Sequence, residues 1–217
     1  MEIFSRTLAL ICILILTPFY IIISICCISF QGFPILFTQE RVGYKFRTFK
    51  IYKFRSMSFN SGEFITSPND SRITKFGKIL RKTKIDEIPQ LFNILKGDMR
   101  FIGPRPEVRQ YFSEEDFVFL SNVKPGISDF ASIILRNESI ILDKIGGDNP
   151  YEKLLPIKLE LANYYSMNKS FWLDIQLVAI TIISILLPDF AIRTFAVPLI
   201  KLRSRRSEVF LSKYIID

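Results

Sequence analysis

Two adjacent acidic residues, Asp86 and Glu87, lie in the part of the chain that is richest in cations. Arg81, Lys82 and Lys84 come shortly before the pair. Cations at this spacing, together with a helix N-terminus, favour the ionised form of a carboxylate. An ionised carboxylate beside bound phosphates attracts Mg²⁺ and can attack phosphorus as a nucleophile. The pair therefore indicates chemistry at a phosphate, with Asp86 and Glu87 as candidate catalytic residues and candidate Mg²⁺ ligands.

The same two acids could instead begin a helix. Asp86 would then be the N-cap and Glu87 an acid of the first turn, where Pro89 is also tolerated because a missing N–H costs little there. Thr83, three residues before Asp86, adds a weak likeness to a capping box. A cap and a catalytic group are compatible, so both interpretations stay open at this point.

Several cations near tight turns could hold phosphate oxygens, since a guanidinium fork matches a phosphate in a bidentate way. Proline on each side of Arg105 restricts where its side chain can point. The alternative is that these cations form salt bridges at the surface, with Asp98 and Glu107 as partners. The candidate phosphate-binding residues are Lys53, Arg55, Arg81, Arg100 and Arg105.

The composition of the 217-residue chain excludes several kinds of site. It contains no His, which rules out a His general base, a His metal ligand and a Ser-His-Asp triad. Its three Cys all fall in one apolar run and have neither zinc spacing nor the look of a disulfide framework. Any chemistry must use carboxylates, hydroxyls, Lys and Arg, or a metal bound through oxygen.

The positive charge is concentrated in one region of the chain. Residues 41–109 hold 16 Lys and Arg against 6 Asp and Glu, a net charge of +10, whereas residues 111–174 hold 6 against 10, a net charge of −4. Such a field suits phosphate-bearing ligands, an anionic membrane face or nucleic acid. We expect no nucleic-acid partner, because the chain shows no zinc finger, RNP-like strand or basic-zipper pattern.

An uncharged run from Thr7 to Phe30 precedes this region. It is long enough to reach across a hydrocarbon core of roughly 30 Å as a helix. A cleaved signal peptide is disfavoured, because the run is too long and no small-residue cleavage site precedes Gln31. Either one spanning helix is kinked at Pro18, or the chain breaks at Thr17-Pro18 and turns back. Lys and Arg on both flanks leave these two alternatives equally open.

Periodicity and turn residues predict the elements that position the candidate groups. Gly97 should end the helix that follows Asp86. The last helix is apolar but too short to span a membrane, so we expect it to lie at the interface or against the body. The predicted elements are loops at 39–43 and 58–71, an extended stretch at 46–54, and helices at 71–84, 86–96, 154–167 and 175–187.

The chain resembles the bacterial sugar transferases, which are monotopic polyprenyl-phosphate phosphoglycosyl transferases that begin lipid-linked glycan assembly. The strings that carry the likeness are KFRSM (Lys53–Met57) and DEIPQLFNILKGDMRFIGPRPE (Asp86–Glu107). Matches at 39–57, at VKPGIS (Val123–Ser128) and in YY…FWLD (Tyr164 to Asp174) extend it over nearly the whole chain.

The resemblance implies an α-rich α+β monotopic membrane protein. Its parts would be a re-entrant helix-break-helix in residues 1–32, a small cytosolic catalytic domain with interfacial amphipathic helices in residues 33–187, and a basic tail in residues 188–217. Met1 and Asp217 would lie on the cytosolic face of the bacterial inner membrane. The tail cations should bind anionic lipid head groups; they are Lys201, Arg203, Arg205 and Arg206.

The resemblance also implies a reaction: a sugar phosphate passes from a UDP-sugar to undecaprenyl phosphate, and UMP is released. Asp86 would be the nucleophile that carries the phosphosugar covalently and contacts Mg²⁺. Glu87 would assist by metal coordination or by proton transfer. Arg81 and Arg105 match the phosphate-holding arginines of the family. Membrane lipids are further expected partners, and downstream glycosyltransferases are candidate ones.

One segment departs from the family pattern. Many relatives follow KPGIT with a Gly-Trp/Leu-x-Gln run, whereas this chain reads KPGISDFASIILRNE (Lys124–Glu138). A similar subgroup handles modified N-acetylated amino sugars, which favours such a donor over a neutral hexose. The chain is also expected to be a minimal catalytic unit, without the multi-pass region of longer relatives. A non-catalytic membrane scaffold is the competing class, but it would not need Asp86, Glu87, Arg81 and Arg105 intact.

Overall fold

A computed structural model describes residues 2–58, 70–200 and 210–216. In chain order, its helices and strands are α1 (Glu2–Gln31), β1 (Leu36–Val42), η1 (Tyr44–Phe46), β2 (Thr48–Phe54), α2 (Lys75–Thr83), η2 (Ile85–Gln90), α3 (Leu91–Lys96), β3 (Arg100–Ile102), η3 (Arg109–Tyr111), η4 (Val118–Ser121), β4 (Gly126–Ser128), α4 (Phe130–Ile134), α5 (Glu138–Ile145), α6 (Pro150–Asn168), α7 (Phe171–Leu186), α8 (Pro188–Ala191), η5 (Ile192–Ala196) and η6 (Ser212–Ile216).

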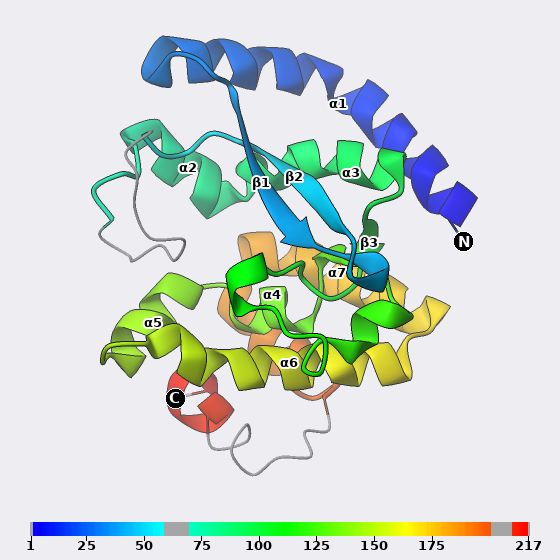
Figure 1. Ribbon diagram of the computed structural model, residues 1–217. Coiled ribbons are helices and arrows are strands. Elements are labelled where there is room, and N and C mark those ends of the chain that lie inside the picture. The colour runs from blue at the N-terminus through cyan, green and yellow to red at the C-terminus, as the bar shows by residue number, and fades with distance from the viewer. Residues whose placement is uncertain (1, 59–69, 201–209, 217) are drawn as a thin grey trace.

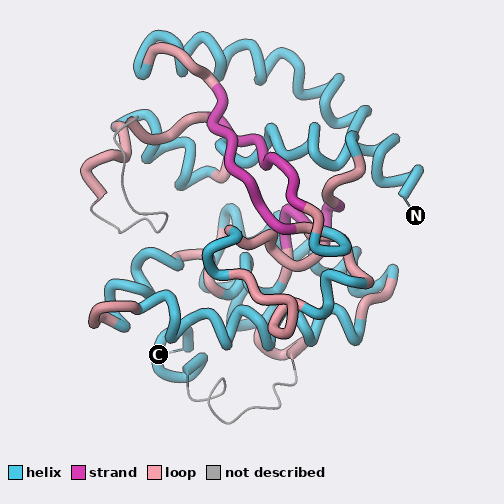
Figure 2. The backbone as a smooth tube through the Cα atoms, viewed as in Figure 1, coloured by secondary structure: helices cyan, strands magenta, loops and turns pink. Residues whose placement is uncertain are grey.

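The helices dominate, and the strands form two small pairs (Figures 1 and 2). β1 and β2 are an antiparallel hairpin, and β3 pairs with β4 in parallel. In Figure 1, α1 arches over α2 and α3, while α4 to α7 make up the other half of the molecule. This mostly helical architecture with a small amount of sheet agrees with the predicted α-rich α+β class.

Helix α1 runs without interruption through Thr17 and Pro18. Pro18 has no N–H to donate, and the Thr17 hydroxyl bonds back to the Ile13 carbonyl at 2.9 Å. The predicted break between two helices is therefore wrong for the hydrogen-bonded helix, which instead bends along its course in Figure 1. The helix accommodates Pro18 because the loss of one backbone hydrogen bond leaves the other hydrogen bonds of a 30-residue helix in place. A re-entrant placement in a membrane stays a prediction.

Among the described residues, α1 alone is long and apolar enough to cross a membrane. Only 11% of its most apolar window is buried, which is unlike the core helix of a water-soluble domain. Its outward side chains form a continuous apolar surface of the kind that contacts lipid. The most exposed of them are Ile3, Phe4, Leu14, Ile15, Phe19 and Phe30.

The hairpin corrects one sequence-based expectation. Residues 39–42 belong to β1 and pair with β2, Gln39 opposite Ile51 and Glu40 opposite Lys50, although the stretch 39–43 was predicted to be a loop. Polar residues are tolerated in this strand because most of β1 faces outward. The extended stretch predicted at 46–54 is confirmed from Thr48 to Phe54 as β2, whereas Phe46 belongs to η1.

The region around the acid pair also differs from the two helices predicted at 71–84 and 86–96. α2 begins at Lys75, because the Thr74 side chain caps it by accepting from the Gly77 N–H at 2.8 Å. The helix predicted to begin at Asp86 is split into the 3₁₀ helix η2 and the short α3. Gly97 ends α3 in the left-handed conformation, with φ of 89°, as predicted.

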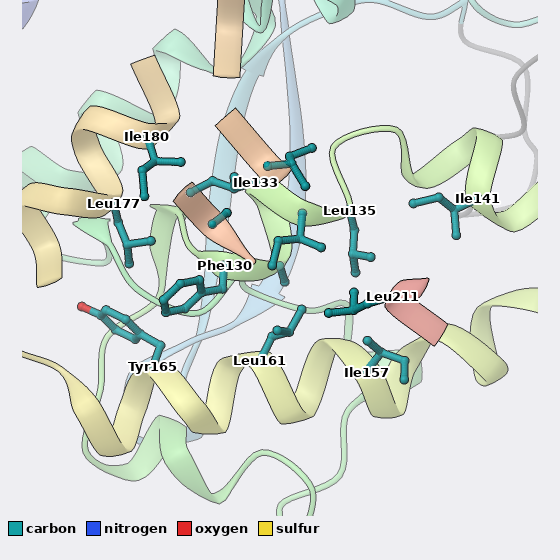
Figure 3. Packing of buried hydrophobic residues seen from close by; sticks show 14 of the residues in the cluster. Phe130, Ile133, Leu135, Ile141, Ile157, Leu161, Tyr165, Leu177, Ile180 and Leu211 are labelled. Carbon is teal, nitrogen blue, oxygen red and sulfur yellow. The ribbon is translucent and has the colours of Figure 1, made fainter. Parts of the chain in front are cut away.

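The main hydrophobic core lies between α4, α6 and α7. In Figure 3, Phe130 of α4 lies close to Tyr165 and Leu161 of α6, and to Leu177 of α7. The helices predicted at 154–167 and 175–187 are confirmed as α6 and α7. α7 buries one stripe on this core and exposes a second apolar face, from Phe171 and Trp172 onward, so its placement at a membrane interface stays a prediction.

The segment predicted as a basic tail also contributes to this core. Ala191, Ile192, Ala196 and Leu211 are buried among the residues of α4 and α6. A division of the chain after residue 187 is thus not visible in the packing of the described residues. The four tail cations lie outside the described residues, as does most of the predicted loop at 58–71.

Candidate active site

A sharp turn between α2 and η2 presents the acid pair. Lys84 adopts the left-handed conformation, with φ of 59°, and its N–H bonds to the Arg81 carbonyl. Glu87 N–H then bonds to the Lys84 carbonyl at 3.1 Å. The N-cap residue of η2 is Lys84 and not Asp86, its side chain makes no capping bond, and the Thr83 hydroxyl bonds back into α2 at Ile79 and Leu80. The helix-cap interpretation of Asp86 is therefore wrong, which leaves its carboxylate available for chemistry.

Glu87 forms ion pairs with two of the predicted cations, Lys53 and Arg105. Lys53 Nζ, from β2, lies 3.0 Å from Glu87 Oε1. Arg105 donates to both carboxylate oxygens, at 2.8 Å to Oε1 and 3.4 Å to Oε2, from the loop that follows β3. Three segments that are distant in the sequence thus meet at one carboxylate. Both Glu87 oxygens are already accepting from cations.

The two acids have opposite electrostatic environments. Burial raises the pKa of Glu87, but Arg105, Lys53 and Lys84 outweigh it and hold that pKa well below its usual range. Burial raises the pKa of Asp86, and the neighbouring Glu87 adds to the rise, while Lys53, Lys84 and Arg81 oppose it. The nearby cations thus offset only part of the effect of burial on Asp86, while two of the predicted cations, Lys53 and Arg105, are paired with Glu87.

Asp86 has an unused carboxylate oxygen. Its side chain is 6% exposed, and Oδ1 is buried without a hydrogen-bond partner among the described residues. An unsatisfied anionic oxygen in such a site suits a cation or an electrophile. Mg²⁺ is commonly bound by one or two carboxylates together with substrate phosphates. The described residues contain no cluster of three or more acidic, His or Cys side chains. A Mg²⁺ held at Asp86 would therefore need oxygen ligands from a substrate.

Two further predicted cations, Arg81 and Arg55, make different contacts. Arg81 is near enough to Asp86 to be attracted to it, and its Nε donates to Ser56 Oγ at 3.0 Å. Arg55 instead donates to backbone carbonyls at the end of α1, including Gly32 at 2.6 Å and Phe33 at 3.0 Å. The described contacts give Arg55 a helix-anchoring role, since its guanidinium donates to carbonyls at and just after the end of α1. Its contact with phosphate stays a prediction.

Glu107 forms a separate buried cluster. Its carboxylate accepts from Arg41 at 3.4 Å, from Lys158 at 3.3 Å and from the Tyr151 hydroxyl, and its carbonyl accepts from Val42 N–H at 2.9 Å. The sequence-based alternative paired Glu107 with the candidate phosphate-binding cations, whereas in the structure its carboxylate bonds to Arg41, Lys158 and Tyr151. These contacts hold the loop that carries Arg105 and Glu107 against β1 and α6.

Asp129 is a site-supporting residue that the sequence interpretation missed. It is buried and accepts from the Ser132 N–H at 2.7 Å, which caps α4, and from the Arg105 N–H at 3.3 Å. The Asp129-x-x-Ser132 spacing, with reciprocal bonds, is a capping box in the structure. That spacing was readable in the sequence, but its contact with the Arg105 backbone was not.

Comparison with known proteins identifies the family. The family model for "Bacterial sugar transferase" matches residues 1–188. The chain belongs to the bacterial sugar transferase family. It is 42% identical over 161 residues to a UDP-N-acetylgalactosamine-undecaprenyl-phosphate N-acetylgalactosaminephosphotransferase of Aeromonas hydrophila, which covers 70% of this chain and 36% of the relative.

Two further members of the family are similar over most of this chain. A UDP-glucose:undecaprenyl-phosphate glucose-1-phosphate transferase of Xanthomonas campestris is 30% identical over 84% of the chain and 38% of its own length. The uncharacterized sugar transferase EpsL of Bacillus subtilis is 36% identical over 73% of both chains. The chain thus spans little more than a third of the first two bacterial sugar transferases named here.

Proposed function

We propose that this bacterial sugar transferase moves a sugar 1-phosphate from a UDP-sugar to undecaprenyl phosphate at the cytosolic face of the bacterial inner membrane. The names of its relatives, which specify a UDP-sugar and undecaprenyl phosphate, support the donor and acceptor classes. The observation that carries the proposal is the contrast within the acid pair: Glu87 is held by two cations, while Asp86 keeps a buried oxygen without a partner among the described residues.

The proposed reaction has two steps at one phosphorus. An Asp86 carboxylate oxygen forms a bond to the sugar-bearing phosphorus, the bond from that phosphorus to the bridging oxygen breaks, and UMP leaves with the electron pair. A phosphate oxygen of undecaprenyl phosphate then attacks the same phosphorus and the bond to Asp86 breaks, which restores the carboxylate. Neither step requires a protein side chain to take up a proton, which suits a chain without His.

Glu87 acts in this proposal through the cations that it holds. With both oxygens engaged by Lys53 and Arg105, it fixes these side chains where they can stabilise the charge of a pyrophosphate. Lys84 and Arg81 add further positive charge near Asp86. Mg²⁺, when bound through Asp86 and the donor phosphates, would supply further shielding of that charge. This geometry favours a charge-holding role for Glu87 over proton transfer.

The proposed donor is a UDP-linked N-acetylated amino sugar. The relative at 42% identity is named for N-acetylgalactosamine, and a putative Bacillus subtilis enzyme at 48% identity over 111 residues carries a similar name. Other relatives are named for glucose, so a neutral hexose 1-phosphate is the alternative. UMP release measured over a panel of UDP-sugars with undecaprenyl phosphate decides between them.

The covalent step is tested by mass spectrometry of the enzyme incubated with the preferred UDP-sugar and no acceptor. We expect a phosphosugar adduct on the peptide that contains Asp86. Asp86→Asn should abolish both the adduct and turnover, while Asp143→Asn, at an exposed position of α5, should leave both unchanged. Ternary-complex kinetics, or full activity in Asp86→Asn, would contradict the mechanism.

A further inference from the structure

A hydrogen bond connects the apolar helix α1 directly to the catalytic turn. The hydroxyl of Tyr20 donates to the carbonyl oxygen of Ile88 at 2.8 Å. Ile88 follows Glu87 in η2, and its carbonyl also accepts from the Leu91 N–H. A carbonyl oxygen has two lone pairs, so it can serve both donors. A residue of the membrane helix therefore bonds to the backbone of the turn that carries the acid pair.

The turn has few bonds of its own. η2 is a 3₁₀ helix, in which hydrogen-bond geometry is poorer than in an α-helix. Pro89 has no N–H, so it cannot make the 3₁₀ bond to the carbonyl of Asp86. The turn also begins at Lys84 in the left-handed conformation, with no side-chain cap. The Tyr20 hydroxyl, which donates to the Ile88 carbonyl from outside the turn, therefore compensates for part of this missing hydrogen bonding.

The packing around Tyr20 reinforces this contact. Its ring lies 5.8 Å from the ring of Phe54 and 5.6 Å from that of Phe92, measured between centroids. The same face of α1 buries Ile23 and Cys27 against Phe54 and Leu80. Three residues of this cluster adjoin a site residue in the sequence: Phe54 follows Lys53, Leu80 precedes Arg81, and Ile85 precedes Asp86.

We propose that Tyr20 is a positioning residue for catalysis, which fixes the Ile88–Pro89 peptide and so orients Asp86 and Glu87. A phenol on an apolar helix has few alternative partners, and losing its bond there would leave a partly buried donor unsatisfied. The contact therefore persists whenever α1 lies against the body. This inference rests on the proposed function for its catalytic part.

The test compares Tyr20→Phe with Tyr164→Phe in the full chain, in lipid nanodiscs. Tyr164 is the matched control, because its hydroxyl donates to the Leu199 carbonyl at 2.8 Å and its ring contacts that of Phe130, away from the turn. Both changes remove one hydroxyl and keep the ring. We expect Tyr20→Phe to lower kcat for UMP release about tenfold with KM changed less than about twofold, and Tyr164→Phe to leave both unchanged.

Hydrogen–deuterium exchange provides a readout that does not depend on turnover. Amides of the peptide spanning residues 85–91 should exchange faster in Tyr20→Phe and at the normal rate in Tyr164→Phe. Equal kcat in the two variants, or unchanged exchange in Tyr20→Phe, overturns the positioning role. A wild-type protein without UMP release would overturn the proposed function and the catalytic part of this inference. The exchange result would still decide whether Tyr20 anchors the turn.

Discussion

Asp86 and Glu87 are neighbours in one turn, yet their carboxylates meet different surroundings. Glu87 is paired with Lys53 and Arg105, while Asp86 is buried with one oxygen unpaired among the described residues. Pairing with cations favours the ionised form of Glu87, whereas burial disfavours the ionised form of Asp86. Two like acids given different environments can take different roles, one as nucleophile and one as a fixed counter-charge.

The counter-charge role of Glu87 can be measured by a double-mutant cycle with Lys53. Glu87→Gln leaves two partly buried cations without their partner and should destabilise the protein by about 3 kcal/mol. Adding Lys53→Met should cost less than the sum of the single changes, because one stranded charge is removed. Thermal melts in detergent check this, with Glu115→Gln at an exposed position as control. Strict additivity would show that the pair is not coupled.

Glu107 provides a prediction about pH. Burial raises its pKa, but Lys158, Tyr151 and Arg41 outweigh that effect and hold it below its usual range. Because the folded pKa lies below the unfolded value of about 4.3, the stabilisation is fully present above that pH and is lost as pH falls through the folded pKa. Glu107→Gln should therefore lower the melting temperature at about pH 7 and have a smaller effect at about pH 3. A difference that grows on acidification would reverse the assigned sign.

Particular residues show what the sequence could reveal about the site. Asp86, Glu87 and Arg105 were found from residue types and spacing, because a phosphate site needs acids and cations at turns. The roles of Arg55 and Glu107 were not predictable, since each depends on which distant backbone or side chain the fold brings close. The low pKa of Glu87 likewise depends on Lys53, which lies 34 positions away.

At the scale of elements, α2 is positioned by close contact with the segment that follows β2. A Cβ added at Gly77 would lie 1.9 Å from the Ser56 carbonyl oxygen, which is backbone and cannot move freely. The neighbouring Ser56 hydroxyl accepts from Arg81 Nε at 3.0 Å. The absence of a side chain at Gly77 thus allows the approach that places Arg81 beside the acid pair.

Gly77→Ala should push α2 away from Ser56. We expect a loss of about 2 kcal/mol in stability from the forced overlap, and a fall in turnover as Arg81 moves. Lys78→Ala, at the next and exposed position of the same helix, should change stability by less than about 0.5 kcal/mol. Melting temperature and UMP release measured on both variants check this. Equal melting of the two variants would mean that the contact with Ser56 is not close.

The elements were predictable where the local signal was strong. Apolar periodicity located α6 and α7, and Gly97 marked the end of α3. β1 was missed because its polar residues resemble a loop until β2 pairs with them. η2 was predicted as the start of an α-helix because the sequence cannot show that Lys84 adopts the left-handed conformation and that Asp86 is not the N-cap.

At the scale of the whole molecule, α1 touches the body along its length. Near its start, Glu2 pairs with Lys124 at 2.8 Å. At its end, the Gln31 side chain donates to the Arg55 carbonyl and accepts from the Thr74 hydroxyl, both at 2.9 Å. A helix of 30 residues is about 45 Å long, more than a hydrocarbon core. Held at both ends by one charged body, α1 cannot place those ends on opposite sides of a bilayer while these contacts persist.

This geometry predicts that both ends of the chain lie on the cytosolic side. Single cysteines at Glu2 and at Lys213, which are both exposed, can be introduced after the native Cys12, Cys26 and Cys27 are replaced by Ala. In intact cells, a membrane-impermeant thiol reagent should label neither site, and both should react once the membrane is opened. A cysteine at Leu14, exposed on α1, should react slowly in either case because lipid covers it. Labelling of the Glu2 site alone in intact cells would mean that α1 crosses the bilayer and that its contact with Lys124 does not form there.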